Sequence, residues 1–154
     1  MNAASRASDL SGKVALVTGA VRGLGSAAVR LLAERGASVV ACDVRSTEGE
    51  QLAADLLSSG HRARFLMLDV TSEDDWRSVE RAVTQEFGGL HVLVNNAGMI
   101  LRQGIAEATL SDWRRVMDVN VTGAFLGTRQ FAPLMIASIR LRRDGARGAL
   151  ILNC

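Results

Sequence analysis

Short runs of apolar and β-branched residues alternate along the chain with longer stretches in which apolar residues recur every three or four positions. The short runs predict five strands, at residues 14–18, 38–42, 64–68, 90–95 and 149–153. The longer stretches predict helices over residues 23–35, 48–58, 72–87 and 111–140. Gly36 and Gly60 stand where the first two helices need a left-handed end, and Ser72 followed by Asp75 is typical of a helix start.

Because strands and helices alternate and the strands are apolar almost throughout, the pattern favours a parallel sheet with helices on both faces. We therefore expect an α/β fold, a doubly wound parallel sheet of the Rossmann type, with five strands in this chain. A length of 154 residues suits a single domain. We place this domain at residues 11–154 and interpret the polar residues 1–10 as a mobile tail.

Composition narrows the class of protein. Hydrophobic residues make up 48% and charged residues 22% of the chain, as in ordinary globular proteins. The net charge of +2, without a basic face interleaved with aromatics, argues against nucleic acid as a partner, and no stretch is long enough to predict a membrane span. Two cysteines cannot form a disulfide framework, so we expect a cytoplasmic location. His61 and His91 are isolated from other metal-type ligands, and we predict no metal site.

The turn after the first predicted strand carries candidate chemistry in the segment TGAVRGLG, Thr18 to Gly25. Gly19 can adopt a backbone angle that other residues avoid as the strand ends. Gly23 leaves room for main-chain N–H groups to approach a phosphate, and Gly25 permits close packing of helix on strand. The positive end of the following helix would face an anion at this point. A tight turn that needs glycine for its own sake is the alternative, but the strand before and the helix after favour a pyrophosphate site.

A carboxylate follows at the distance that dinucleotide binding requires. Asp43 ends the second predicted strand 18 residues after Gly25, where an acid can accept hydrogen bonds from the adenosine ribose hydroxyls. The same charge would repel the 2′-phosphate of NADP, whereas Arg22 and Arg45 could each pair with that phosphate. We give more weight to the carboxylate at the strand end and expect NAD as the cofactor, with NADP less favoured.

Four motifs in this order resemble those of the short-chain dehydrogenase/reductase family. They are TGAVRGLG at Thr18–Gly25, LDVT at Leu68–Thr71, NNAG at Asn95–Gly98 and DVNVTG at Asp118–Gly123. The resemblance covers nearly the whole chain. It implies that Asp69 and Val70 hold the adenine ring, and that Asn120 is the family's helix asparagine, which holds a water in the proton relay. It further implies dinucleotide contacts from these residues: Thr18, Gly19, Arg22, Gly23, Leu24, Gly25, Asn95, Ala97 and Gly98.

The residues around Asn120 support a special position only in part. On a helix, Val116, Asn120, Gly123 and Gly127 share one face, so that an amide and two glycines interrupt an apolar stripe. Glycine within a helix costs about 1 kcal/mol relative to alanine, which indicates close packing or function. The alternative is an asparagine whose amide is simply bound by neighbouring backbone groups.

Family members carry a catalytic serine after the fifth strand and a Tyr-x-x-x-Lys pair on the next helix. This chain ends at Cys154, contains no tyrosine, and has its one lysine, Lys13, before the first strand. We interpret the sequence as cut within the fifth strand and expect this chain alone to be inactive.

Two functional hypotheses follow. The first is an oxidoreductase that interconverts a secondary alcohol and a ketone with NAD, represented here by its cofactor half. The second is a non-catalytic nucleotide-binding module or pseudoenzyme. A small-molecule alcohol or ketone is the expected substrate of the complete enzyme, and the resemblance implies a homo-oligomer for the complete fold.

Overall fold

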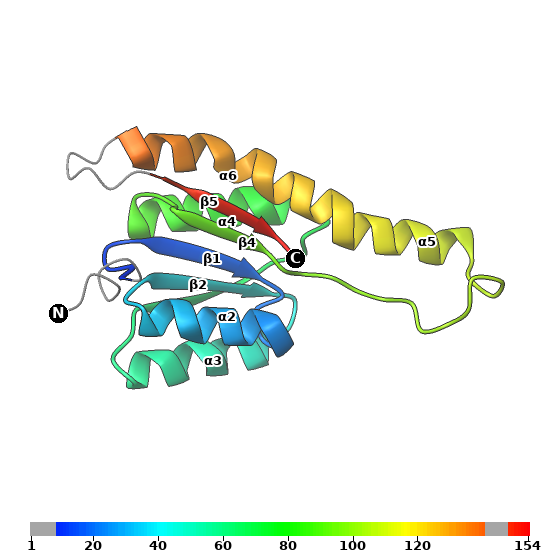
Figure 1. Cartoon of the computed structure of the whole chain (residues 1–154), viewed down its shortest axis with the longest axis horizontal. Helices are drawn as coiled ribbons and strands as arrows, with labels where there is room; N and C mark the ends of the chain where they lie inside the picture. Colours follow the sequence, from blue (N-terminus) through cyan, green and yellow to red (C-terminus); the bar gives the residue numbers. More distant parts are fainter. Residues whose placement is uncertain (1–8, 141–147) are drawn as a thin grey trace.

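The computed structural model describes residues 9–140 and 148–154 and shows one parallel sheet (Figure 1). Its strand order is β3-β2-β1-β4-β5, and every neighbouring pair is parallel. The five predicted strands are therefore confirmed, with ends that differ by two residues at most. Their bounds are β1 Val14–Thr18, β2 Ser38–Asp43, β3 Ala63–Met67, β4 Val92–Asn95 and β5 Leu150–Asn153.

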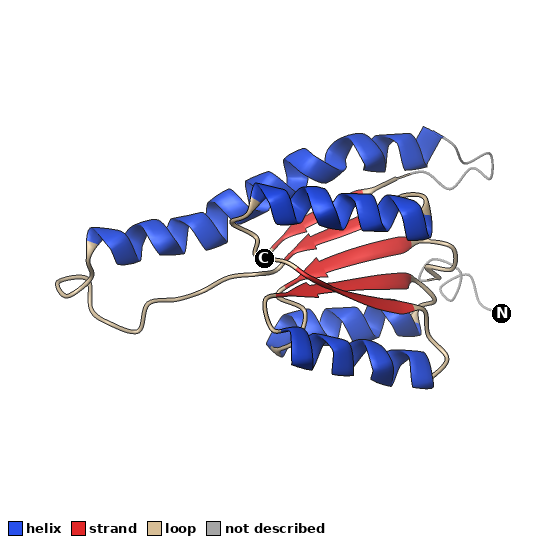
Figure 2. Cartoon of the chain, turned by 180° about the vertical axis from the view of Figure 1, so that it is seen from behind, coloured by secondary structure: helices blue, strands red, loops and turns tan. Residues whose placement is uncertain are grey.

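Helices cover both faces of the sheet, which confirms the doubly wound architecture (Figure 2). Helices α2 and α3 pack on one face, and α4 and α6 pack on the other. The chain crosses from one face to the other after β3, so β1 and β4 lie side by side in the sheet and the connections that follow them lead to opposite faces. The helical segments are α2 Gly23–Glu34, α3 Ser46–Ser58, α4 Glu73–Phe87, α5 Leu110–Met117, the π-helical turn η1 Asp118–Thr122, and α6 Gly123–Arg140.

Strand alternation divides the buried residues into two cores. Leu16, on β1, belongs to the cluster beneath α4 and α6, together with Trp76 and Phe131. Its neighbours Ala15 and Val17 belong to the cluster beneath α2 and α3. Both faces of each central strand are thus buried, which explains why the sequences of those strands are nearly unbroken apolar runs.

The single helix predicted over residues 111–140 is wrong in one respect. The structure has α5 and α6 joined by the π-helical turn η1, which contains Asn120. A π turn adds one residue to one turn of a helix, too small a change for the three-to-four-residue periodicity to reveal. Gly123, at the start of α6, follows the turn directly and lies against Val70, where an added Cβ would come within 2.8 Å of the Val70 Cγ2.

Residues 100–117, which we call the arm, project away from the sheet (Figure 1). The arm comprises the loop after β4 and helix α5, and α5 buries none of its residues. Helix α5 begins with a capping box. The Thr109 hydroxyl accepts a hydrogen bond from the Asp112 N–H, and the Asp112 carboxylate accepts one from the Thr109 N–H. Helix α5 thus starts through local hydrogen bonds rather than through burial.

The described N-terminal end bears on the predicted tail. Residues 1–8 of the predicted tail lie outside the described residues, while Leu10 packs on the α2 side of the sheet and its N–H donates to the Arg35 carbonyl at 2.7 Å.

Of the helices within residues 9–140, none is long and apolar enough to cross a membrane. The same described residues contain no group of three or more His, Cys, Asp or Glu side chains that could hold a metal ion.

Candidate dinucleotide-binding site

A cavity of about 590 Å³ opens at the carboxyl ends of the strands. This is the edge at which doubly wound sheets bind their ligands, and the volume is within the usual range for small-molecule sites. The turn after β1, the ends of β2 and β3, the loop after β4 and the α5–η1 segment all contribute to it. Its lining comprises Gly19, Asp43, Val44, Arg45, Leu68, Asp69, Val70, Thr71, Ala97, Gly98, Met99, Ser111, Arg114, Arg115, Asp118 and Val119.

The β1–α2 turn shows why its three glycines are needed. Gly19 has a φ of +62°, which favours glycine, and an added Cβ there would lie 2.9 Å from the Ala97 Cα. An added Cβ on Gly25 would lie only 2.1 Å from the Gly19 carbonyl oxygen, so the helix can approach the turn this closely only with glycine. Gly23 has a φ of +52°, which also favours glycine, although the space beside it is open, with no atom within 4 Å of an added Cβ.

The N-terminus of α2 leaves its N–H groups available. Its N-cap residue, Arg22, makes no side-chain capping bond, and no acidic residue stands in the first turn. The first N–H groups of a helix need partners, and the helix dipole favours an anion there. The turn therefore offers the donors and the field that a phosphate group requires.

Thr18 and Asn96 hold the two strand ends together. The buried Thr18 hydroxyl accepts hydrogen bonds from the N–H groups of Asn96 and Ala97, both at 3.0 Å. The Asn96 amide donates back to the Thr18 and Gly19 carbonyls at 2.9 and 3.1 Å. Thr18 thus supports the turn from below, and it does not line the cavity.

Asp43 lies at the end of β2 with 6% of its surface exposed and lines the cavity. Its carboxylate accepts hydrogen bonds from the Val21 N–H at 3.3 Å and the Arg45 N–H at 3.2 Å, and the Arg45 guanidinium lies 3.9 Å away. The Arg22 guanidinium instead pairs with Glu48 on α3 at 3.1 Å. The carboxylate is thus held in one place, and both candidate phosphate-binding arginines have an acidic partner, Arg22 in Glu48 and Arg45 in Asp43 itself.

Asp69 and Val70 follow β3, the strand beside β2, and form another part of the cavity wall. The Asp69 carboxylate oxygen Oδ1 accepts hydrogen bonds from the Thr71 N–H at 2.9 Å and the Thr71 hydroxyl at 2.7 Å. Val70 is buried with its side chain against Gly123. An exposed carboxylate beside a buried apolar side chain can accept from an amino group while packing on a flat ring.

The structure brings some predicted site residues together and not others. Gly19, Asp43, Asp69, Val70, Ala97 and Gly98 all line the cavity, whereas Thr18, Arg22, Gly23, Leu24, Gly25 and Asn95 do not. Leu24 is exposed. The Asn95 amide points towards α6 and β5, donating to the Asn153 side chain at 2.9 Å and the Thr128 hydroxyl at 3.3 Å. It is the next residue, Asn96, whose amide supports the glycine turn.

Asn120 is bound by backbone groups, as the alternative interpretation of the sequence expected. Its Oδ1 accepts from the Met99 N–H at 2.8 Å, and its Nδ2 donates to the Met99 carbonyl at 3.0 Å. This two-bond tether fastens the loop after β4 to the π-helical turn. In this arrangement Asn120 orients the loop after β4, and it borders a second cavity rather than the one lined by Asp43.

Sequence reasoning missed several residues of the cavity. Arg114 and Arg115, on α5, bring positive charge to its rim, but an arginine pair on a helix carries no signal of its own. Asn96 could have been identified from the sequence as a candidate site residue, because it stands in the NNAG motif beside Asn95. Period-two alternation places Asn95 on the same face as Leu93, beneath α6, and so away from the cavity.

The fold and this cavity define a doubly wound α/β domain with a candidate dinucleotide site at the carboxyl edge of its sheet. The family model for short chain dehydrogenases matches residues 13–152, and the chain belongs to that family. It is 42% identical over 142 residues to a 3-alpha-(or 20-beta)-hydroxysteroid dehydrogenase of Mycobacterium tuberculosis, covering 92% of this chain and 51% of the relative. It is 39% identical over 141 residues to the trans-4-hydroxycyclohexanecarboxylate dehydrogenase of Sinomonas cyclohexanicum, covering 87% of this chain and 54% of the relative.

A solved structure agrees with these sequence matches. A short-chain dehydrogenase from Novosphingobium aromaticivorans superposes with a TM-score of 0.83 at 30% identity, covering 93% of this chain and 52% of that one. The chain thus spans about half the length of the relatives that it matches. The predicted family and fold are confirmed.

Proposed function

We propose that this chain is the dinucleotide-binding part of an NAD-dependent oxidoreductase that interconverts a secondary alcohol and a ketone. The observation that carries the proposal is the cavity in which Gly19, Asp43, Asp69 and Val70 meet at the carboxyl edge of the sheet. In this assignment the α2 N-terminus binds the pyrophosphate, Asp43 accepts from the adenosine ribose, and Asp69 with Val70 holds the adenine. The nicotinamide, when bound, would supply the hydride chemistry.

The preference for NAD over NADP rests on charge at the ribose. A 2′-phosphate would come close to the buried Asp43 carboxylate, which has two backbone donors to keep it in place. Arg22 already pairs with Glu48, so it is less available to compensate. Arg45, which lies beside Asp43 and is half exposed, favours the opposite preference. We give Asp43 the larger weight because a like charge at the ribose costs affinity directly.

An alicyclic secondary alcohol is the substrate class that we propose for the complete enzyme. The named relatives are dehydrogenases of hydroxysteroids and of a hydroxycyclohexane carboxylate. Beside the proposed nucleotide site, a second cavity of about 660 Å³ has apolar walls that include Ile100, Leu101, Ile105 and Trp113. Met99 and Asn120 border it, and Met99 lines both cavities. A ring-shaped apolar substrate would suit such walls.

A non-catalytic nucleotide-binding module remains the second hypothesis. The chain contains no tyrosine, and its one lysine precedes β1, so we expect it to bind dinucleotide without turning over an alcohol. A homo-oligomer of the complete fold and a cytoplasmic location also stay predictions. The location rests on the two cysteines, which are both free, with Cys42 buried and Cys154 exposed.

Calorimetry with NAD, NADP and AMP tests the proposal on this chain. We expect NAD to bind more tightly than NADP, and Asp43→Ser to weaken NAD by about 10- to 100-fold, since a charge-assisted hydrogen bond contributes about 1.5–3 kcal/mol. The variant should lose less affinity for NADP, because the repulsion disappears together with the bond. Glu34→Gln, which removes an exposed carboxylate at the far end of α2, is the matched control.

Three results would contradict parts of the proposal. A wild-type chain that binds neither NAD nor AMP would refute the nucleotide site. An unchanged NAD-to-NADP ratio in Asp43→Ser would refute the role of that carboxylate. Turnover of cyclohexanol or a hydroxysteroid by this chain alone would refute its predicted inactivity.

A further inference from the structure

The first turn of α4 is bonded to the backbone of the residues proposed to hold the adenine. The indole N–H of Trp76 donates to the Val70 carbonyl at 2.9 Å, and this side chain is fully buried. One residue earlier, the Asp75 carboxylate oxygen Oδ2 accepts from the Asp69 N–H at 2.9 Å. Two successive residues of α4 are thus hydrogen-bonded to the backbone of two successive residues of the cavity wall, Asp69 and Val70.

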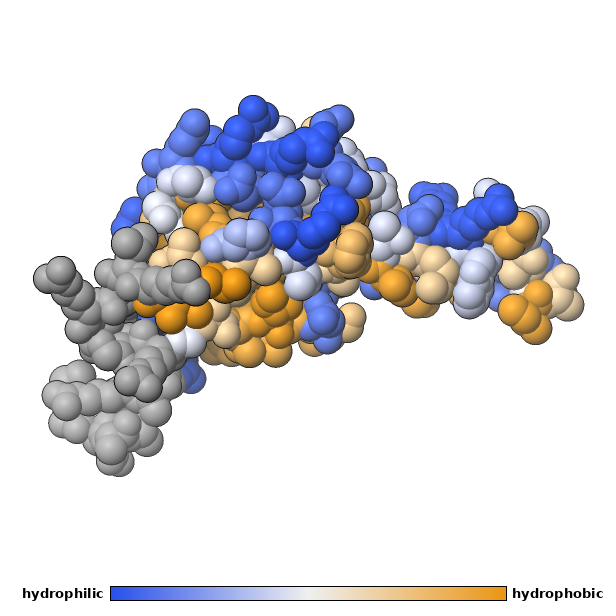
Figure 3. Space-filling view, turned by 90° about the horizontal axis from the view of Figure 1, so that it is seen from above, coloured by the Kyte–Doolittle hydropathy of each residue, from blue (hydrophilic) through white to orange (hydrophobic). Residues whose placement is uncertain are grey.

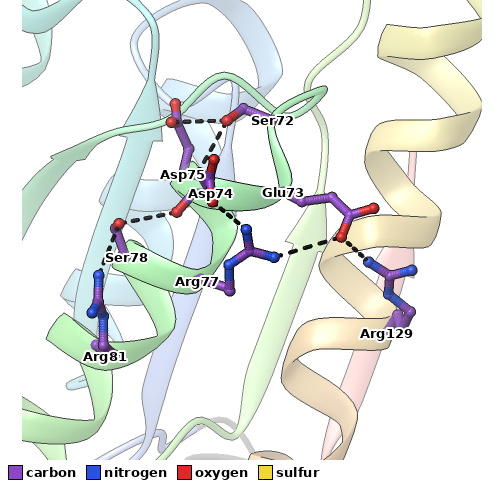
Figure 4. Close-up of polar contacts among 8 residues, drawn as sticks. All are labelled: Ser72, Glu73, Asp74, Asp75, Arg77, Ser78, Arg81 and Arg129. Carbon is purple, nitrogen blue, oxygen red and sulfur yellow. Dashed lines mark hydrogen bonds and ion pairs between the residues drawn. The ribbon is translucent and has the colours of Figure 1, made fainter.

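The other oxygen of Asp75 is also bonded. Asp75 Oδ1 accepts from the Ser72 hydroxyl at 2.9 Å, and the Ser72 hydroxyl in turn accepts from the Asp75 N–H at 3.2 Å (Figure 4). These bonds cap α4 and orient the Asp75 carboxylate. A salt bridge of 2.8 Å between Glu73 and Arg129 joins the same turn to α6 (Figure 4).

Close packing holds the opposite side of the wall. An added Cβ on Gly123 would meet the Val70 side chain at 2.8 Å, and one on Gly127 would meet the Trp76 ring at 2.6 Å. Phe131 makes an edge-on contact with Trp76, with 6.1 Å between the ring centroids. The two glycines of α6 therefore have a packing reason: they let the helix press Val70 and Trp76 into one arrangement.

We propose that Asp75 and Trp76 are positioning residues that determine selectivity for adenine over other bases. The proposal rests on the proposed function, in which Asp69 and Val70 hold the base. Neither Asp75 nor Trp76 lines the cavity, so each acts through the wall residue that it binds.

The chemistry of the Asp69 carboxylate explains the selectivity. Oδ1 is engaged by Thr71, so the carboxylate keeps acceptor capacity on its second oxygen. An adenine amino group can donate to that oxygen, whereas hypoxanthine presents a carbonyl at the same position and would be repelled. The discrimination depends on where the carboxylate stands, because hydrogen bonds weaken steeply with poor geometry. Asp75 and Trp76 set that geometry by holding the backbone of residues 69 and 70.

The ratio of AMP to IMP affinity tests this role, because a general loss of stability would lower both affinities alike. We expect wild-type protein to prefer AMP by about tenfold, the value of one good hydrogen bond. Trp76→Phe keeps a ring in the buried space but lacks the indole N–H, and the preference should fall to about two- or threefold. Binding of nicotinamide mononucleotide should not change.

A second variant guards against misfolding of the first. Asp75→Ala removes the acceptor for the Asp69 N–H and should also reduce the AMP preference. Glu73→Gln is its matched control, since it removes the ion pair of the same helix turn with Arg129 on α6 while the bonds of Asp75 stay in place. It should lower the thermal midpoint and leave the AMP-to-IMP ratio unchanged.

The outcomes separate this inference from the proposed function. If wild-type protein prefers AMP and folded Trp76→Phe and Asp75→Ala keep that preference, the positioning role is wrong while the nucleotide site stands. If Glu73→Gln lowers the ratio as much as Asp75→Ala does, the effect is one of helix stability and the role is again wrong. If wild-type protein binds neither nucleotide, the proposed function itself fails.

Discussion

The two tryptophans of the chain mark two regions that are built in different ways. Trp76 is 1% exposed, hydrogen-bonded to Val70, and packed between α4 and α6 beneath the cavity wall. Trp113, on the arm, is 55% exposed. The region around Trp76 derives its shape from burial, whereas the arm around Trp113 does not.

The arm also differs from the region around Trp76 in its exposed apolar side chains. Figure 3 shows hydrophobic surface both on the arm and on the adjoining body of the molecule. Exposed large apolar side chains of the arm are Ile100, Ile105, Leu110 and Trp113, and Val121 in η1 and Phe125 in α6 are exposed as well. The described contacts within the arm are local, such as those of Asp112 with Thr109 and Gln103.

The difference indicates how function divides between the regions. The nucleotide cavity has walls held by buried contacts within this chain, and we expect it to form without help. The apolar side of the arm has no such cover among the described residues, and large exposed apolar patches mark sites where something else packs. We therefore expect substitutions near the cavity to affect stability and nucleotide binding together, and substitutions of the exposed apolar side chains of the arm to affect neither.

The largest effect that we expect comes from Gly25→Ala. Its new Cβ would stand 2.1 Å from the Gly19 carbonyl oxygen, so the backbone of the turn or of α2 must move. Overpacking of this kind costs about 3 kcal/mol at the upper end of the usual range, and NAD binding should disappear with the distorted turn. Urea denaturation and calorimetry measure the two effects. Gly60→Ala, a left-handed position with open space around it, should cost about 1–2 kcal/mol and leave NAD binding intact.

A smaller effect is expected from Asn120→Ala, which separates the two regions at their junction. The variant loses both hydrogen bonds to Met99 at an exposed site, so the cost should be about 1 kcal/mol. Hydrogen exchange of the Met99 amide should become faster, while amides of β1 keep their protection. Thr122→Ala, in the same π-helical turn, is the control. Unchanged exchange at Met99 would show that the tether does not hold the loop in solution.

The contrast between the regions also explains what the sequence could predict. Strands, helices and the glycine turn follow local rules, so alternation, periodicity and the Thr18–Gly25 spacing were sufficient for them. Asp43 could be placed because a strand end is a local feature. The family resemblance then assigned Asp69 and Val70, and both line the cavity.

The remainder depends on contacts between distant segments. The local sequence does not show that the Trp76 indole is hydrogen-bonded to the Val70 carbonyl or that Asn120 is hydrogen-bonded to Met99. Both bonds depend on how loops lie against helices. The glycines at 123 and 127 were rightly interpreted as signs of close approach, but their partners, Val70 and Trp76, became visible only in the packed structure. Periodicity could not reveal the arm, because α5 continues the helical pattern although none of its residues is buried.

At the start of the arm we expect a local dependence on pH. Hydrogen bonding from the Thr109 side chain and backbone, and from Gln103, lowers the pKa of Asp112 from its ordinary value. A lowered pKa in the folded state means that the stabilisation is present above the ordinary pKa, about 3.8, and is lost as the pH falls below it through the lowered value. Chemical shifts of residues 110–113, followed between pH 5 and about 2, should show α5 fraying from its first turn. A simultaneous loss of β1 signals would contradict a local effect.

The smallest effect should come from Trp113→Ser. Because the side chain is largely exposed and makes no described hydrogen bond, its removal should change the free energy of unfolding by no more than about 0.5 kcal/mol. The variant also leaves Trp76 as the only tryptophan, so its fluorescence reports on the cavity region alone. The urea midpoint from this signal should coincide with that of wild-type protein, and NAD affinity should be unchanged. A loss of more than 1 kcal/mol in monomeric protein would mean that the arm packs on the body in solution, and the division between the two regions would not hold.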